Sequence, residues 1–226
     1  LDTDGQWPSC INVARKNYAL LMPNGTVKLT GNSIKSKKLQ GYLEDFIDKG
    51  LRLLLEGKGG DFVEYYYEYL AKIYNKEIPL AKIANKSRVK QKVESYKKRC
   101  KQRTKAGNLM SRQAHMELII KNNVTVSLGD TIYYVNNGKV MSHGDVQRKK
   151  KKDGTEEIIL HSYLISENDL DSGAMGEYNV PRYISTFNKR VEPLLVCFKP
   201  EVRESLIKKI PEDREYYTKT QCNLIN

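Results

Sequence analysis

Two aspartates near the start of the chain have the residue types and the spacing of a metal site. The chain opens on LDTDGQWPSC, in which Asp2 and Asp4 flank a threonine. On a strand, residues at this spacing point to the same face, so their carboxylates would lie a few ångströms apart. Such a pair is costly unless a cation lies between it and a third carboxylate, and Mg²⁺ suits this arrangement. Taken alone, the stretch is more typical of an acidic turn at a chain end, because Asp and Gly favour turns.

The rest of the sequence carries none of the common catalytic patterns. It contains no GxSxG nucleophile motif, no HExxH zinc motif and no GxxxxGK(S/T) phosphate-binding loop. His115, His143 and His161 are far apart and have no partner pattern, so we expect surface or packing roles for them. The four cysteines lack zinc or disulfide spacing, which favours a reduced, intracellular protein.

The positive charge of the chain indicates a polyanionic partner. Lys and Arg outnumber Asp and Glu by 39 to 27, which gives a net charge of +12. A domain this basic usually attracts a polyanion, and nucleic acid is the first candidate. The alternative is a charge that only improves solubility. The densest basic cluster consists of Lys97, Lys98, Arg99, Lys101, Arg103 and Lys105.

A second basic run, Arg148–Lys152, ends at Asp153-Gly154, and this ending predicts a mobile turn. The run suits a loop that faces DNA and a solvated turn equally well. No apolar run is long enough to span a bilayer, and the start lacks a signal peptide. Since the chain begins with Leu1 rather than Met, we expect both ends to be cuts through a longer protein.

The elements that would position these residues begin with a predicted β-hairpin. NVARKNYALLM, residues 12–22, has the pattern of a single strand with Tyr18, Leu20 and Met22 on one face. A turn at residues 23–25 leads to a second strand, TVKLT. A basic, polar segment from Gly31 to Lys38 follows.

Helical spacing of apolar residues then predicts two helices, over 39–55 and 62–74, separated by the stop signal GKGG. The second contains EYYYEYL, whose tyrosines we expect to pack between helices with hydrated hydroxyls rather than to stack on bases. Further helices are predicted over 112–121 with Ser111 as N-cap, over 180–191 with Asn179 as cap, and around 201–209.

Between these helices the pattern changes to that of strands. Residues 131–135 and 139–141 flank Asn136-Asn137-Gly138, which is a hairpin signal, and 158–165 has the pattern of one further strand. The order is therefore hairpin, helices, a small β insertion and helices again. This order predicts an α+β fold that is mainly helical.

The segment after the aspartates resembles a known family. ARKNYALLMPNGTVKLTGNSIKSKKL is similar to the Lys-x-Tyr segment of family B DNA polymerases, with Lys16 and Tyr18 in the motif positions. In that family, an Asp-Thr-Asp hairpin of the palm precedes this segment, and a glycine-containing basic strand leads from it into the thumb. Gly31, Lys37 and Lys38 match that strand.

The resemblance continues to the end of the chain. IPLAKIANKSRVKQKVESYKK is similar to a thumb segment in which Lys86 and Tyr96 hold the characteristic places. SRQAHMELIIKNNVTVSLGDTIYYV resembles the segment that leads into a Gly-Asp-x-Ile-x-Tyr-Val strand, and YNVPRYISTFNKRVEPLL resembles the final thumb helix. The Asp-Thr-Asp-Gly form, with Trp7 and Cys10 nearby, looks like the epsilon-type variant of the family.

The resemblance implies a C-terminal fragment of a DNA-directed DNA polymerase of a phage or another virus, acting in DNA replication by template-directed nucleotidyl transfer. Residues 1–38 would form the C-terminal edge of the palm, including its β-hairpin remnant, and residues 39–226 the thumb with a small β insertion. The fingers, the exonuclease and the family's other metal-binding aspartate have no counterpart here. We therefore expect the isolated chain to be inactive. The alternative is a noncatalytic nucleic-acid-binding protein derived from a polymerase thumb.

The resemblance also implies roles for single residues. Asp4 would be a metal ligand and Asp2 its neighbour, in a two-Mg²⁺ catalytic site that residues outside this chain complete. Lys16 and Tyr18 would hold the primer–template near its 3′ end. Backbone phosphates would be contacted by Lys37, Lys38, Lys86 and Arg88.

The partners implied by the resemblance are primer–template DNA, a deoxynucleoside triphosphate and the remainder of the polymerase, either in the same polypeptide or in a partner chain. No membrane is implied. The expected location is intracellular, namely the host cytoplasm for a phage protein, or the nucleus for a eukaryotic or viral one.

Overall fold

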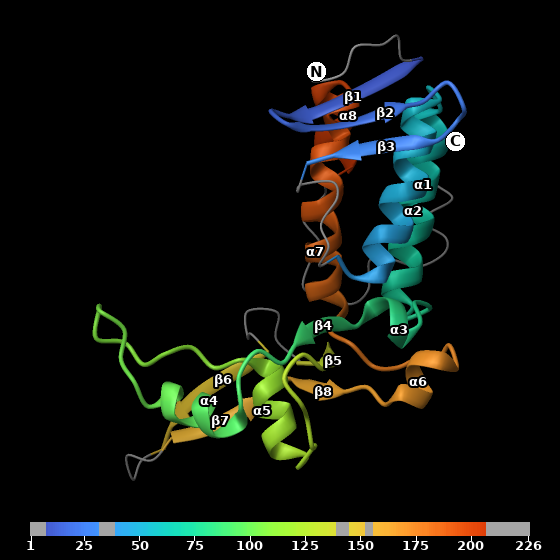
Figure 1. Cartoon of the computed structure of the whole chain (residues 1–226). Helices are drawn as coiled ribbons and strands as arrows, with labels where there is room; N and C mark the ends of the chain where they lie inside the picture. The colour runs from blue at the N-terminus through green and yellow to red at the C-terminus, as the bar shows by residue number, and fades with distance from the viewer. Residues whose placement is uncertain (1–7, 32–38, 139–144, 152–155, 207–226) are drawn as a thin grey trace. The chain divides into compact units, whose positions relative to one another are not determined.

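The computed structural model describes residues 8–31, 39–138, 145–151 and 156–206 (Figure 1). The chain divides into two compact units. The first unit consists of Leu1–Ile78 together with Val180–Asn226, and the second of Pro79–Asn179. Both units combine helices with short antiparallel sheets, so the predicted α+β class is confirmed. The predicted boundary between a palm edge and a thumb at residue 38 stays a prediction.

The first unit begins with a three-stranded antiparallel sheet in the order β1-β2-β3. Its strands are β1 (Ser9–Ala14), β2 (Asn17–Leu21) and β3 (Val27–Thr30). The predicted hairpin is confirmed as β2–β3, with a turn in which the Gly25 N–H donates to the Met22 carbonyl at 2.9 Å. The prediction of one strand over residues 12–22 was wrong. The chain reverses at Arg15-Lys16, where Lys16 adopts a positive φ of 62°. The pattern of apolar residues did not predict this turn.

Helices form the rest of the first unit, and Figure 1 shows α1, α2 and α7 side by side, with the sheet packed against them. Their bounds are α1 (Gly41–Leu55), α2 (Gly59–Tyr74), α7 (Val180–Val191), the 3₁₀ helix η1 (Glu192–Cys197) and α8 (Pro200–Leu206). The predicted stop after α1 is confirmed, because Gly57 takes the positive φ of 76° that ends a helix. Helix α7 also ends where predicted, ahead of Pro193.

The tyrosines of α2 are part of an aromatic core, which confirms that they pack between helices. Phe46 of α1 lies at the centre, with its ring centroid 5.1 Å from that of Tyr65 and 4.7 Å from that of Phe187 on α7. The Tyr69 ring lies 5.3 Å from Phe46, and its hydroxyl donates to the Tyr42 carbonyl at 2.7 Å. The hydroxyl of Tyr69 is therefore satisfied by the backbone rather than by solvent.

The second unit surrounds helix α5 with short strands (Figure 1). Two antiparallel sheets are present in its described residues, one in the order β4-β5-β8 and a two-stranded ribbon of β6 and β7. The strands are β4 (Asn85–Arg88), β5 (Thr131–Asn136), β6 (Val146–Lys150), β7 (Glu156–Leu160) and β8 (Ser162–Leu164). The helices are α3 (Leu80–Ile83), α4 (Val93–Cys100), α5 (Ala114–Lys121) and α6 (Glu167–Asp171).

Helix α5 provides the core of the second unit on two sides. One side packs Met116 and Ile119 against Tyr96 and Cys100 of α4. The other side packs Leu118 against Tyr134 and the partly buried residues of β6, β7 and β8. Burial on both sides explains why α5 is apolar over most of its length, and it fixes α4 and the sheet to one framework.

Two sequence predictions fail at the ends of elements in this unit. Helix α5 begins at Ala114 with Gln113 as its N-cap residue, so Ser111 does not cap it. The single strand predicted over residues 158–165 is divided between β7 and β8 at His161, whose backbone N–H donates to the Asp145 carbonyl at 3.0 Å. Both corrections concern boundaries, which local propensity specifies weakly.

The basic run 148–152 is the larger correction, because residues 148–150 belong to strand β6 and not to a mobile turn. In the register of the β6–β7 ribbon, Lys149 lies opposite Glu157 and Lys150 opposite Glu156. An exposed lysine opposite a glutamate, as Lys149 is opposite Glu157, stabilises an antiparallel pair. The strand that pairs with this run lies beyond the run itself, so the run alone did not predict it. The predicted hairpin arm 139–141 lies outside the described residues, and strand β5 pairs with β4 and β8.

Candidate nucleic-acid interface

The turn between β1 and β2 displays the first group of predicted contact residues. Arg15 and Lys16 are both exposed there, and the Asn17 side-chain amide donates to the Arg15 carbonyl at 3.1 Å. Because Lys16 holds a positive φ of 62°, its backbone is in a conformation that ordinary residues adopt only at some cost. The turn therefore projects two neighbouring cationic side chains from the end of a paired strand.

Gly31 lies directly against this turn. It follows β3, in which Thr30 pairs with Tyr18 of β2, and its φ is +97°. A Cβ at Gly31 would overlap both the Asn17 side chain and the Lys16 carbonyl oxygen. Only glycine permits this close approach. The structure thus brings together Lys16, Tyr18 and Gly31, which the sequence resemblance placed in two separate motifs.

Tyr18 differs from Lys16 in exposure. Its side chain is only 9% exposed, and the following Ala19 and Leu20 are fully buried. Tyr18 therefore anchors β2 in the unit, whereas Lys16 is accessible; a role of Tyr18 at DNA stays a prediction. Four other predicted site residues lie outside the described residues, namely Asp2, Asp4, Lys37 and Lys38.

Strand β4 presents the second group, in the other unit. Lys86 and Arg88 are exposed, whereas Asn85, Ser87 and Val89 are half-buried or buried. Since alternate residues of a strand share a face, Lys86 and Arg88 point to the same solvent-facing side. Pairing with β5 holds them in place, with Lys86 opposite Tyr133 and Arg88 opposite Thr131.

The backbone of the Gly-Asp motif fixes the guanidinium of Arg88. Arg88 Nε donates to the Gly129 carbonyl at 3.1 Å, and Gly129 itself takes a φ of +103°. The Val89 N–H donates to the Asp130 carbonyl at 2.8 Å, which closes the loop onto the strand. Arg88 remains exposed. Its Nε–H fixes the orientation of the guanidinium, and its other N–H groups can face a ligand.

Further lysines continue the basic surface of the second unit from the end of β4 onto α4. The exposed ones are Lys90, Lys92, Lys97 and Lys98. Glu94 is the acidic residue among them. Clustered cations of this kind raise the local concentration of a polyanion.

A buried polar network attaches this basic helix to α5. Tyr96 is fully buried, and its hydroxyl donates to Glu117 Oε1 at 2.6 Å. The same hydroxyl accepts the Gln113 N–H at 3.0 Å. Arg112 Nη1 donates to Glu117 Oε1 at 2.7 Å, so one carboxylate oxygen joins a tyrosine and an arginine.

The electrostatics of the network favour the neutral phenol of Tyr96 and the charged guanidinium of Arg112. Burial, together with the hydrogen bond to Glu117, raises the pKa of Tyr96, so its phenol remains a donor. Burial alone would lower the pKa of Arg112, but the hydrogen bond and the charge of Glu117 outweigh it and the pKa is raised. The network therefore holds α4 in a fixed register. Glu117 and Arg112 were not among the residues predicted to be functional. A carboxylate inside the apolar run AHMELII does, however, indicate a buried polar contact.

Within the described ranges, no group of three or more His, Cys, Asp or Glu side chains is placed to hold a metal ion. The predicted Mg²⁺ ligands Asp2 and Asp4 lie outside those ranges, so the Mg²⁺ site stays a prediction. None of the helices in the described parts of the chain has both the length and the apolar character that are needed to cross a membrane.

The chain was compared with known proteins. No family model matches it, and no curated protein matches it. Among solved structures, it is similar to the family B DNA polymerase from the hyperthermophilic archaeon Pyrobaculum calidifontis, with 15% sequence identity and a TM-score of 0.49. The match covers 82% of this chain and 20% of that one, so the chain spans about a fifth of the length of that polymerase. At this level of identity the likeness concerns the fold and assigns neither catalysis nor DNA binding.

Proposed function

We propose that the chain is the palm edge and thumb of a family B DNA polymerase, and that it holds primer–template duplex DNA through backbone phosphates. The observation that carries this proposal is the pair Lys86 and Arg88 on one exposed face of β4. Lys86 occupies a place that the resemblance assigns to DNA contact, and Gly129, which orients Arg88, belongs to the Gly-Asp-x-Ile-x-Tyr-Val motif.

The spacing of the two cations suits a nucleic-acid strand. Residues two apart on a strand are separated by about 7 Å along its axis, which is close to the rise of two nucleotides along one strand of a duplex. Neither side chain forms an ion pair with an acidic residue among the described parts of the chain. Both are therefore available to phosphates, and the exposed lysines of α4 extend the same unit's positive surface.

The first unit supports the palm-edge assignment independently. Two motifs that are separate in the sequence resemblance, Lys-x-Tyr and the glycine of the basic strand, are in direct contact where Gly31 meets the β1–β2 turn. Lys16 is exposed at this point, as a residue that contacts the primer end must be. The contact explains why residue 31 is a glycine, since a larger residue would overlap the turn.

Phosphate contacts fit the proposed task, because a replication enzyme must bind duplex without selecting a sequence. In the complete enzyme, Asp2 and Asp4 are proposed as acidic residues of the catalytic site. Two Mg²⁺ ions would there activate the attacking oxygen and stabilise the leaving group of the deoxynucleoside triphosphate. The fingers and the other metal-binding aspartate would come from the remainder of the polymerase.

A binding comparison tests the proposal. Fluorescence anisotropy of the purified chain should show tighter binding to a primer–template duplex than to a single strand of equal length. The affinity should be the same for duplexes of unrelated sequence and should fall steeply with salt. Equal affinity for the single strand would instead identify a general basic scaffold, and sequence-dependent duplex binding would contradict recognition through phosphates.

A further inference from the structure

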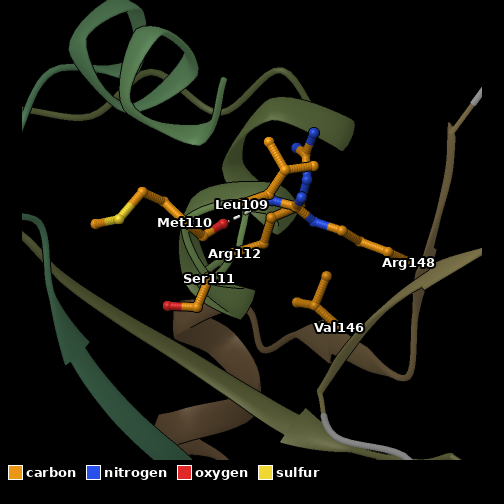
Figure 2. A pocket seen from close by; sticks show the side chains of 6 residues that line it. All are labelled: Leu109, Met110, Ser111, Arg112, Val146 and Arg148. Carbon is orange, nitrogen blue, oxygen red and sulfur yellow. Dashed lines mark hydrogen bonds between the residues drawn. The ribbon is translucent and has the colours of Figure 1, made fainter. Parts of the chain in front are cut away.

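A pocket of about 420 Å³ opens beside helix α5 in the second unit (Figure 2). It lies between the segment that precedes α5 and strand β6. Its lining consists of Leu109, Met110, Ser111, Arg112, Val146 and Arg148. Two of these residues are arginines and none is acidic, so the charge of the lining is positive.

Both arginines are held by protein acceptors. Arg148 extends from β6 across the pocket, and its Nη2 donates to the Met110 carbonyl at 2.6 Å (Figure 2). Its Nη1 lies 3.9 Å from Glu156 Oε2, a long contact with a side chain that is 40% exposed. Arg112 is bound through Nη1 to buried Glu117. The two guanidinium groups are therefore oriented before any ligand binds. The carboxylate of Glu156 only weakly neutralises the charge of Arg148, because it is distant and exposed.

One donor in this arrangement has no acceptor. Arg112 Nε is buried and has no hydrogen-bond partner among the described residues, and the same is true of Nε and Nη2 of Arg99 on α4. Buried donors are rarely left without a partner, because their desolvation is then uncompensated, and a bound ion or ligand can supply the missing acceptor. Protein acceptors therefore satisfy only part of the hydrogen-bonding capacity of Arg112, whose side chain lines the pocket.

A second pocket of about 360 Å³ shares Arg112 and Val146 with the first and includes His115 and Asp145. Asp145 is the acidic residue of that lining. Its Oδ1 already accepts hydrogen bonds from the Asn136 amide at 3.0 Å and from the Ser162 hydroxyl at 3.1 Å. Its charge is thus spread over two donors on the side of β5 and β8, whereas the first pocket contains only cations and neutral groups.

We propose that the Arg112–Arg148 pocket binds a terminal phosphate group. The guanidinium fork matches the oxygens of a phosphate and forms strong charge-assisted hydrogen bonds with them. A phosphodiester inside a strand meets projecting side chains, such as Lys86, whereas guanidinium groups recessed in a pocket, such as those of Arg112 and Arg148, are reached by a group that enters end-on. The source is either a small molecule, such as pyrophosphate or a nucleotide, or the 5′-phosphate of a strand. This site does not depend on the proposed polymerase function.

The first experiment titrates pyrophosphate into the full chain, with binding followed by calorimetry and by the Nε–H resonances of the arginines. We expect saturable binding and a shifted Arg112 resonance. Arg148→Gln should weaken binding by about tenfold, the effect of losing one hydrogen bond to a charged group. Arg112 is left intact, because its removal would leave the buried carboxylate of Glu117 unpaired.

The control is Lys149→Gln, which removes the same charge from the adjacent, exposed position of β6, on the opposite face of the strand. This variant should bind pyrophosphate as the wild type does. Absence of pyrophosphate binding by the wild type would overturn the proposal. Equal losses in the Arg148 and Lys149 variants would also overturn it, because the attraction would then come from general charge.

The second experiment separates the two sources. Oligonucleotides of identical sequence, with a 5′-phosphate or a 5′-hydroxyl, compete with pyrophosphate for the chain. Stronger competition by the phosphorylated strand, lost in Arg148→Gln, supports a strand end as the ligand. Equal competition by both strands, with pyrophosphate binding retained, supports a small phosphate-bearing molecule.

Discussion

Replacing Tyr96 by Phe should destabilise the second unit more than the loss of one ordinary tyrosine hydroxyl would. The fully buried hydroxyl of Tyr96 joins two groups, since it donates to Glu117 at 2.6 Å and accepts from the Gln113 backbone at 3.0 Å. Phe keeps the ring and its packing against Met116 and Ile119. The substitution therefore isolates the polar network from the apolar core.

The magnitude follows from the two hydrogen bonds. A hydrogen bond to a charged group contributes about 1.5–3 kcal/mol, and a backbone N–H left without its partner costs about 1–3 kcal/mol. Glu117 keeps its ion pair with Arg112 at 2.7 Å, which limits the damage. The Gln113 N–H is partly buried, so the lower part of its range applies. We therefore expect a loss of about 2–4 kcal/mol in the free energy of unfolding.

Urea denaturation followed by far-UV circular dichroism gives this free energy, and hydrogen exchange of the amides in α4 and α5 locates the loss. The control is Tyr163→Phe in the same unit. The Tyr163 hydroxyl makes one hydrogen bond, at 3.0 Å to the Glu177 carbonyl, in an exposed setting. Its removal should cost about 1 kcal/mol or less. Two results would refute the claim that the network holds α4 in place. One is an equal loss of unfolding free energy in the two variants, and the other is faster hydrogen exchange that does not include the amides of α4.

Two further effects follow from the structure. Gly31→Ala should destabilise the chain by about 1–3 kcal/mol in thermal or urea denaturation, because Gly31 combines a φ of +97° with a backbone contact to Lys16. Gly25→Ala, at φ +77° with open space around it, should cost less, and equal costs would show that the close approach is unimportant. Burial and the charge of Arg99 lower the pKa of His115, so the unfolded chain binds more protons than the folded one as pH falls below about 6.5. Stability should decrease from pH 7 to pH 5, and His115→Gln should flatten this decrease; an unchanged slope would exclude His115 as its source.

The parts of the fold that the sequence predicted are those whose signals are local. Helices α1 and α2 follow from apolar spacing and from the glycines between them. The β2–β3 hairpin follows from its turn residues. The packing of the α2 tyrosines was also predictable, because they recur at helical spacing among apolar residues.

Other features depend on contacts between distant residues and had no local signal. The run 148–150 is a strand because it pairs with β7, which begins at Glu156, beyond the run itself. The separation of unit two from unit one requires the chain to return at Val180, which no composition change marks. The burial of Glu117 could have been predicted, since a carboxylate in an apolar helix needs a partner. Its partner Tyr96 could not, because it lies 21 residues earlier in the chain.

The salt dependence of duplex binding by Lys86→Ala tests the central claim most directly. Each phosphate contact contributes about one unit to the slope of log affinity against log salt. The variant should bind all duplex sequences more weakly and should lower this slope by about one unit. Lys121→Ala, which removes an exposed lysine from the last turn of α5, should leave the slope unchanged. A slope that is equal in the two variants and the wild type, or a loss confined to particular sequences, would contradict the account.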